Sequence, residues 1–316
     1  MITGTLLYVF SSIAYLLAPP FWPLLAVRIF HGIGLALFHT AIFTLVANIT
    51  PEMHRGQLTS YFYLSNNMAF ALGPYFGMVL INRYNFGVLF LVCTGLSLCS
   101  LFITMKLDKR DIIPLENQSF EIQNLLSREA LPPSIIAFML NIIWGTVSAF
   151  FPLYALRHGV SNPGIFFIFF FITMILGRAL GGKILDIYDK KKVLIPCLAA
   201  IIISLTILTF STTLPMFILV AVVLGIGWAL LYPSLLIYAF ENAGSARGPA
   251  MGTFTGLADF GAGIGPMIMG IILEWTSYPN MFLCLTLIGV INFLYFYYAI
   301  GRKGERGLLN GGQRGI

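Results

Sequence analysis

The chain has 316 residues, of which 58% are apolar and 9% are charged. A soluble domain carries about 25% charged residues, so this composition excludes a water-soluble globular protein and indicates a protein of the lipid bilayer. The formal net charge of +6 does not indicate nucleic-acid binding, because the basic residues occupy short segments between long apolar runs, a distribution typical of membrane proteins.

Ten apolar runs are each long enough for a helix that crosses a hydrocarbon core, which needs about 20 residues. Turn-forming residues such as Pro19-Pro20 and Pro132-Pro133 separate the runs. The runs are too long for barrel strands and lack the alternation of such strands. We therefore predict an all-α membrane protein with helices over 2–18, 23–47, 57–81, 86–106, 133–156, 163–184, 192–211, 214–239, 249–273 and 280–300.

Lysines and arginines are distributed unequally between the two sets of loops. One set, together with the C-terminal tail, holds fourteen of the 18 Lys and Arg residues. The opposite loops hold Arg83 and Arg157, and Arg28 and Arg178 lie within predicted helices. Because cytoplasmic loops carry the excess of cations, we predict that both termini are cytoplasmic and that the protein lies in the plasma membrane.

One long polar segment, 107–131, separates the fourth predicted helix from the fifth. We interpret it as a cytoplasmic linker between two helical bundles. The predicted domains are therefore an N-terminal bundle over 1–106, a C-terminal six-helix bundle over 132–300 and a cytoplasmic tail over 301–316.

Several short motifs recur at an offset of 192 or 193 residues, which indicates an internal duplication. The pairs are Gly32-Ile33-Gly34 with Gly225-Ile226-Gly227, Arg55-Gly56 with Arg247-Gly248, and Gly73-Pro74 with Gly265-Pro266. Parallel repeats of this kind occur in transporters. Because the second half begins near residue 131, we predict that the first half lacks about 60 residues, enough for two helices.

Ionisable and polar residues inside apolar helices are candidate functional groups. Asp259 is the one acid in the middle of a predicted helix, and a carboxylate removed from water tends to gain a proton, as a proton carrier must. Its repeat partner is Asn67. His39 follows Arg28 by eleven residues, so both share a helix face. The alternatives are a hydrogen-bonded Asp259 and an interior histidine with no role in proton transfer.

Three motifs give the chain a resemblance to the major facilitator superfamily. The first is a loop motif of glycine, aspartate and trailing cations, formed by Gly182, Asp186, Lys190 and Lys191. The second is the arginine-glycine segment 28–34. The third is Gly73-Pro74 with Gly77, which is commoner in family members that exchange protons for an exported solute.

The resemblance implies a two-bundle fold of about ten helices and a secondary transporter that works by alternating access. It implies a role for Arg28 in proton coupling, and the alternatives are an ion pair, a hydrogen bond or a side chain that extends to the membrane surface. We expect proton-coupled efflux of a drug, sugar or metabolite. The sequence contains no phosphate-binding Gly-x-x-x-x-Gly-Lys-Ser/Thr motif that would indicate a nucleotide-driven pump.

The resemblance also implies a gate and a substrate cavity. Arg178 and Asp186 can share a face near the cytoplasmic end of their helix, where a contact between them would hold the inward gate shut. Gly265-Pro266 and Gly73-Pro74 are expected to let helices approach closely and to bend them. The expected cavity residues, grouped by helical spacing, are Asn141, Trp144 and Ser148, and Trp228 and Tyr232.

Two alternatives to transport are a truncated, non-transporting remnant and a membrane sensor on the same scaffold. An enzyme is not expected, because the four histidines do not cluster and no nucleophile motif is present. The four cysteines lie within apolar runs without metal-ligand spacing, so we expect no metal and no cofactor. The expected partners are a small-molecule substrate, protons and the lipid bilayer, and we expect a monomer.

Overall fold

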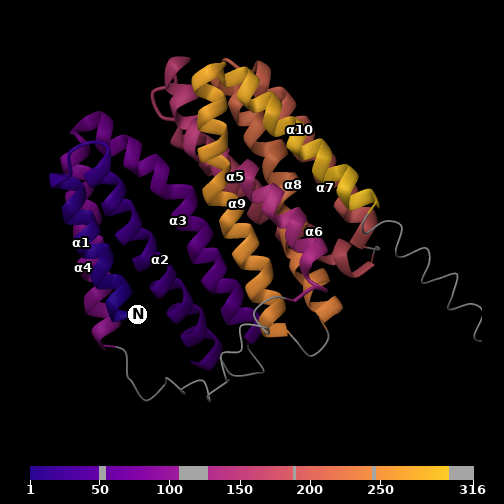
Figure 1. Ribbon diagram of the computed structural model, residues 1–316, viewed down its shortest axis with the longest axis horizontal. Coiled ribbons are helices and arrows are strands. Elements are labelled where there is room, and N and C mark those ends of the chain that lie inside the picture. The colour runs from indigo at the N-terminus through magenta and orange to yellow at the C-terminus, as the bar shows by residue number, and fades with distance from the viewer. Residues whose placement is uncertain (50–54, 107–126, 188–189, 244–246, 299–316) are drawn as a thin grey trace, which may run out of the picture. The chain divides into compact units, whose positions relative to one another are not determined.

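The computed structural model describes residues 1–49, 55–106, 127–187, 190–243 and 247–298, and all regular secondary structure within these ranges is helical. The helices are α1 (Ile2–Leu17), α2 (Trp22–Ile49), α3 (Arg55–Arg83), α4 (Phe86–Lys106), α5 (Leu131–Arg157), α6 (Gly164–Ile187), α7 (Lys190–Phe210), α8 (Leu214–Ala243), α9 (Arg247–Trp275) and α10 (Tyr278–Phe296) (Figure 1). The all-helical fold class predicted from the apolar runs is confirmed.

Nine of the described helices are long and apolar enough to cross a membrane. The exception is α1, which has 16 residues. At a rise of about 1.5 Å per residue it is shorter than a hydrocarbon core about 30 Å thick. The protein is therefore a multi-pass membrane protein in which α1 is the shortest apolar helix of the described part.

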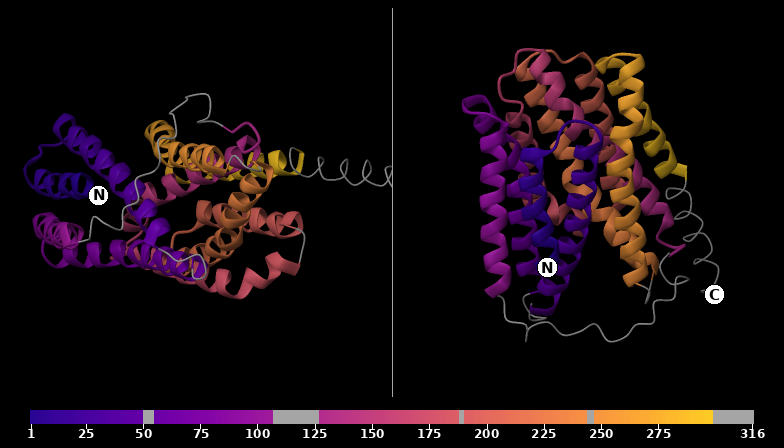
Figure 2. Two further views of the ribbon diagram at one scale, coloured as in Figure 1. Left: turned by 90° about the horizontal axis from the view of Figure 1, so that it is seen from below. Right: turned by 60° about the vertical axis from the view of Figure 1, so that its left-hand side comes forward.

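The chain divides into two compact units, unit 1 (Met1–Gln118) and unit 2 (Ser119–Ile316). In unit 1, α1 packs against α2 and α4. In unit 2, α5 packs along α9, and α8 packs against both α6 and α7 (Figure 2). The helix α10 contacts α7 and α5. The predicted linker lies mostly outside the described residues, and the predicted domain bounds stay a prediction.

The helix bounds repeat at the offset found in the sequence. An offset of 192 residues joins the first residue of α2 to that of α8, of α3 to that of α9, and of α4 to that of α10. The packing repeats as well, because α1 contacts α2 and α4 just as α7 contacts α8 and α10. Both observations support an internal duplication of helices.

Small residues allow the same close helix crossing in both units. A Cβ atom built on Gly34 of α2 would lie 2.9 Å from the Cβ of Leu7 and 3.2 Å from the carbonyl oxygen of Gly4, both in α1. The equivalent Gly227 of α8 lies against α7, where an added Cβ would be 2.8 Å from the Cys197 carbonyl oxygen. Only glycine fits these crossings without a backbone shift.

The glycines of α9 allow a close approach to α5. A Cβ on Gly265 would lie 2.7 Å from the carbonyl oxygen of Ile142, and Gly261 faces the Phe138 carbonyl in the same way. The repeat partner of Gly265 in α3 differs, because a Cβ on Gly73 would meet no described atom within 4 Å. The close approach expected at both glycine-proline motifs is thus present around Gly265 and is not seen around Gly73.

The start of α5 is held by the short segment before it. The Ser127 backbone N–H donates to Thr253 Oγ1 of α9 at 2.9 Å, in a buried position. The Ser127 hydroxyl donates to Glu129 Oε2 at 3.0 Å. The pKa of the Glu129 carboxyl is lowered by a hydrogen bond from the Glu129 backbone N–H and by the one from the Ser127 hydroxyl. These contacts place the first turn of α5 beside α9.

Candidate functional site

Four polar or aromatic side chains of α1 and α2 form one cluster in unit 1, which we call the Arg28 cluster: Tyr8, Tyr15, Arg28 and His31. The Tyr15 hydroxyl and His31 Nδ1 are 3.1 Å apart and share a hydrogen bond. The guanidinium carbon of Arg28 lies 5.3 Å from the centre of the Tyr15 ring. A cation above a tyrosine face at this distance is attracted by the ring quadrupole.

The imidazole of His31 lies between two tyrosine rings of α1. Its ring centre is 5.2 Å from that of Tyr8 and 5.8 Å from that of Tyr15, and both contacts are edge-to-face. The Tyr15 ring also stacks on Phe90 of α4 at 5.2 Å. The imidazole is therefore held by aromatic contacts and one hydrogen bond, while Arg28 is exposed.

Helical spacing explains why these side chains meet. Tyr8 and Tyr15 are seven residues apart and share one face of α1, and Arg28 and His31 are three apart on α2. The close crossing at Gly34 brings the two faces together. From the sequence, His31 was identified only as part of the arginine-glycine segment 28–34. The signal that predicts the cluster is the spacing of Tyr8 and Tyr15 on one helix and of Arg28 and His31 beside Gly34 on the next.

The other predicted proton-coupling residues lie elsewhere. His39 is half-buried on α2, and Asn67 is half-buried on α3. Asp259 is exposed on α9 of unit 2. The structure thus brings Arg28 together with Tyr15 and His31, and a role of His39 in proton transfer stays a prediction.

Two of the predicted cavity residues, Trp144 of α5 and Trp228 of α8, lie in contact, with ring centres 5.9 Å apart. Trp144 stacks on Phe170 of α6 at 4.7 Å and meets the edge of Phe171 at 5.8 Å. Trp228 is buried, with 8% of its surface exposed. These rings connect α5, α6 and α8. Trp144 and Trp228, two of the predicted cavity residues, therefore pack within the helical bundle of unit 2.

Two polar side chains of the predicted cavity form hydrogen bonds to backbone carbonyls of their own helix. The Asn141 side-chain amide donates to the Ala137 carbonyl oxygen at 2.8 Å, and the Ser148 hydroxyl donates to Gly145 O at 2.9 Å. Tyr232 of α8 meets the edge of Phe254 of α9 at 5.4 Å. Asn141 and Ser148 keep their oxygen atoms as acceptors, and their binding role stays a prediction.

The predicted gate lies near the end of α6. Arg178 donates from Nε to the carbonyl oxygen of Ala229 in α8 at 3.1 Å. The side chains of Asp186, Lys190 and Lys191 and the surroundings of Gly182 lie outside the described part of the structure. The Arg178–Asp186 contact therefore stays a prediction, and the structure gives Arg178 a backbone partner on α8.

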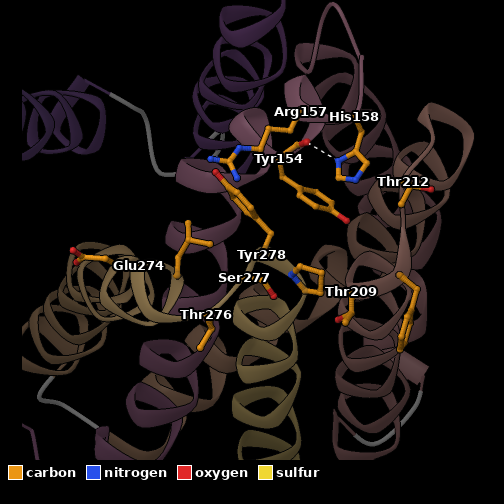
Figure 3. A pocket seen from close by; sticks show the side chains of 12 residues that line it. Tyr154, Arg157, His158, Thr209, Thr212, Glu274, Thr276, Ser277 and Tyr278 are labelled. Atoms are coloured by element: carbon orange, nitrogen blue, oxygen red, sulfur yellow. Dashed lines mark hydrogen bonds between the residues drawn. The ribbon is translucent and has the colours of Figure 1, made fainter.

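A cavity of about 580 Å³ opens among the helix ends of unit 2 (Figure 3). The Arg157 guanidinium carbon lies 4.9 Å from the centre of the Tyr278 ring. The His158 ring donates from Nδ1–H to the Tyr154 carbonyl oxygen at 2.9 Å, and the Tyr154 hydroxyl donates to the Ser211 carbonyl oxygen at 2.6 Å. This cavity was not predicted from the sequence.

No group of three or more His, Cys, Asp or Glu side chains is arranged to hold a metal ion in the described ranges. The helices, the repeat and the glycine crossings together define a duplicated multi-pass helical bundle of the kind found in membrane transporters. The sequence profile of the Major Facilitator Superfamily matches residues 1–185 and 163–314. The chain belongs to this superfamily, and its members are transporters and not enzymes.

Relatives of known name agree with this family. The staphylopine export protein of Staphylococcus aureus is 25% identical over 285 residues, which cover 85% of this chain and 72% of that protein. An uncharacterized MFS-type transporter of Methanocaldococcus jannaschii is 25% identical over 312 residues, covering 93% and 80%.

Solved transporter structures share the fold. A nucleoside transporter, NupG, superposes with a TM-score of 0.76 at 15% identity and covers 93% of this chain and 81% of that one. A peptide transporter, POT, gives a TM-score of 0.74 at 15% identity and covers 95% and 80%. At this identity the likeness concerns the fold alone.

Proposed function

We propose that the protein is a secondary active transporter that exports a small solute in exchange for protons by alternating access. Membership of the superfamily carries the transport part of the proposal. The internal duplication of helices supports alternating access, because secondary transporters are commonly built from such repeats. The sequence lacks a phosphate-binding loop for a nucleotide, so an ion gradient is the energy source that fits.

Protons as the coupling ion are supported by ionisable groups on helices of both units. Asp259 is an exposed acid on α9, and His31 is hydrogen-bonded to Tyr15 near Arg28. Carboxylate and imidazole side chains are the groups that exchange protons in membrane proteins. We assign proton transfer to Asp259 and the Arg28 cluster, with His39 and Asn67 as further polar positions.

Export is the direction that two observations support. The Gly73-Pro74 motif is commoner in family members that exchange protons for an exported solute. A relative that covers most of this chain is named as an export protein. The solute class that we propose is a drug, a sugar or another small metabolite.

The plasma membrane, with both termini cytoplasmic, is the location that we propose. The loop charges support it, since fourteen of the 18 Lys and Arg residues fall on one side. We propose that the protein acts as a monomer.

Replacement of Asp259 tests the coupling. Asp259→Asn keeps the side-chain volume and removes the titrating group, so we expect proton-driven flux to be lost while solute exchange without a gradient continues. The measurement is flux in proteoliposomes under an imposed pH gradient, with a solute found by thermal-shift screening. Glu274→Gln, an exposed acid at the end of the same helix, is the matched control.

Full proton-driven flux by Asp259→Asn would rule out Asp259 as the coupling residue. Solute binding by the wild-type protein without any flux would instead favour the membrane sensor or the non-transporting remnant.

A further inference from the structure

Unit 1 has an unusual charge composition. Residues 1–106 contain a single acid, Glu52, which lies outside the described residues, and α1, α2, α3 and α4 contain none. The same helices carry Arg28, which lies six residues after the first residue of α2. The helices of unit 1 therefore offer this arginine no carboxylate of their own.

The guanidinium of Arg28 contacts the Tyr15 ring at 5.3 Å and is exposed. Within the described part of the chain it makes no ion pair. An ionised arginine in an apolar helix costs free energy unless an opposite charge or hydrogen-bond acceptors approach it. The face contact with Tyr15 orients the guanidinium and leaves its N–H groups, which lie in the guanidinium plane, available for an acceptor.

His31 supplies a second donor beside this guanidinium. Its Nδ1 bonds to the Tyr15 hydroxyl at 3.1 Å, which fixes the ring and leaves Nε2 for another partner. Two donor groups of this kind, one permanently cationic and one that can become cationic, match a carboxylate or a phosphate. A neutral acceptor would form a weaker hydrogen bond with Arg28, and a cationic group would be repelled by it.

We propose that Arg28, Tyr15 and His31 bind the anionic group, a carboxylate or a phosphate, of the transported solute. The proposal rests on the transport function and names the substrate class as an organic anion or a zwitterion. A lipid headgroup phosphate has the same chemistry, so the experiment separates the two sources.

Binding is expected to depend on pH through His31. The titratable and charged groups that face it are Tyr8 and Tyr15 from α1 and Arg28 from its own helix, while α4 contributes the Phe90 ring behind Tyr15. Protonated His31 adds a second positive charge next to Arg28, a repulsive pair that a bound anion relieves. The anion is therefore expected to bind more tightly at acidic pH.

The test uses three ligands with one ring and different charge: benzoate, benzyl alcohol and benzylammonium. Their binding to the purified full chain is measured by thermal shift and calorimetry at two pH values, with inorganic phosphate as a second anion. We expect the anions to bind and stabilise the protein more than the neutral and cationic analogues, and more strongly at the lower pH.

Variants then locate the site. Arg28→Gln is expected to weaken benzoate binding by roughly tenfold or more, since a charge-assisted contact is lost. His31→Gln is expected to remove the pH dependence of benzoate binding and to keep residual binding. Tyr15→Phe keeps the aromatic ring beside Arg28 but loses the hydrogen bond to His31. Arg83→Gln, an exposed cation at the end of α3 in the same unit, is the matched control and is expected to bind as the wild type does.

Three outcomes overturn the proposal. The first is equal binding of benzoate and benzyl alcohol, or no binding of either anion, by the wild type. The second is Arg28→Gln with unchanged benzoate affinity at an unchanged melting temperature. The third is stabilisation by anionic phosphatidylglycerol in nanodiscs but not by free anions, which would assign the cluster to a lipid headgroup.

The proposed transport function can fail separately. Anion binding that depends on Arg28, in a protein without any flux, would support the site and contradict the transporter. Proton-driven flux of a neutral solute that is unaffected by Arg28→Gln would contradict the site and leave transport intact.

Discussion

At the scale of single residues, several polar side chains buried among apolar helices form hydrogen bonds to the backbone. Tyr154 is an example, with 3% of its surface exposed and its hydroxyl bonded to the Ser211 carbonyl oxygen at 2.6 Å. Its ring also contacts Phe217, Tyr278 and Phe282. This tyrosine therefore ties the end of α5 to the end of α7 through one short hydrogen bond.

Removal of that hydroxyl gives a residue-scale prediction. Tyr154→Phe keeps the ring contacts and leaves the Ser211 carbonyl without its donor, so we expect a loss of about 1–3 kcal/mol of stability. The measurement is the midpoint of thermal unfolding in detergent. Tyr297→Phe, at a tyrosine with 56% of its surface exposed, is the control and is expected to leave the midpoint unchanged. Equal midpoints for Tyr154→Phe and the wild type would show that the bond contributes nothing.

Single functional candidates could be identified from the sequence, but the residues that contact them could not. The sequence identified Arg28 as a functional candidate from its place in an apolar helix. It did not identify Tyr15 or His31 as partners of this residue, because their contact depends on how closely α1 and α2 cross. Helical spacing grouped Trp144 with Asn141 and Ser148, but the stacking of Trp144 on Phe170 of α6 could not be predicted from spacing within one helix.

At the scale of helices, glycine decides which pairs approach most closely. Helix α5 lies against α9 through Gly261 and Gly265, and α8 lies against α7 through Gly227. In membranes, packing of this kind replaces the hydrophobic effect as the source of helix association. The approximate helix bounds could be predicted from the sequence because apolar runs and turn-forming residues indicate them, whereas the pairing of helices needed the structure.

A matched set of glycine substitutions tests this account. Gly265→Ala would place a Cβ 2.7 Å from the Ile142 carbonyl oxygen, so we expect a loss of about 1–3 kcal/mol from overpacking. Gly263→Ala on the same helix and Gly73→Ala on α3 meet no described atom within 4 Å. Both are expected to keep or raise stability, since alanine favours a helix over glycine. Thermal unfolding of the three variants is the measurement, and a harmless Gly265→Ala would contradict the close approach.

At the scale of the whole molecule, the internal duplication predicted from the sequence appears again in the helix bounds and in the helix packing. The offset of 192 residues recurs in the first residues of three helix pairs and in the packing of α1 and α7 with their neighbours. Superfamily membership follows from the sequence profile. The solute could not be predicted, because the fold is shared by transporters of different substrates and the specificity depends on single side chains.

The proposed transport mechanism requires that solute movement is coupled to a proton gradient. The direct measurement uses liposomes that hold the purified wild-type protein and a pH-sensitive dye under an imposed pH gradient. We predict that the gradient collapses faster only when both protein and solute are present, and that an uncoupler abolishes solute accumulation. Solute accumulation that persists after the uncoupler, or a gradient that the solute leaves unchanged, would contradict the account.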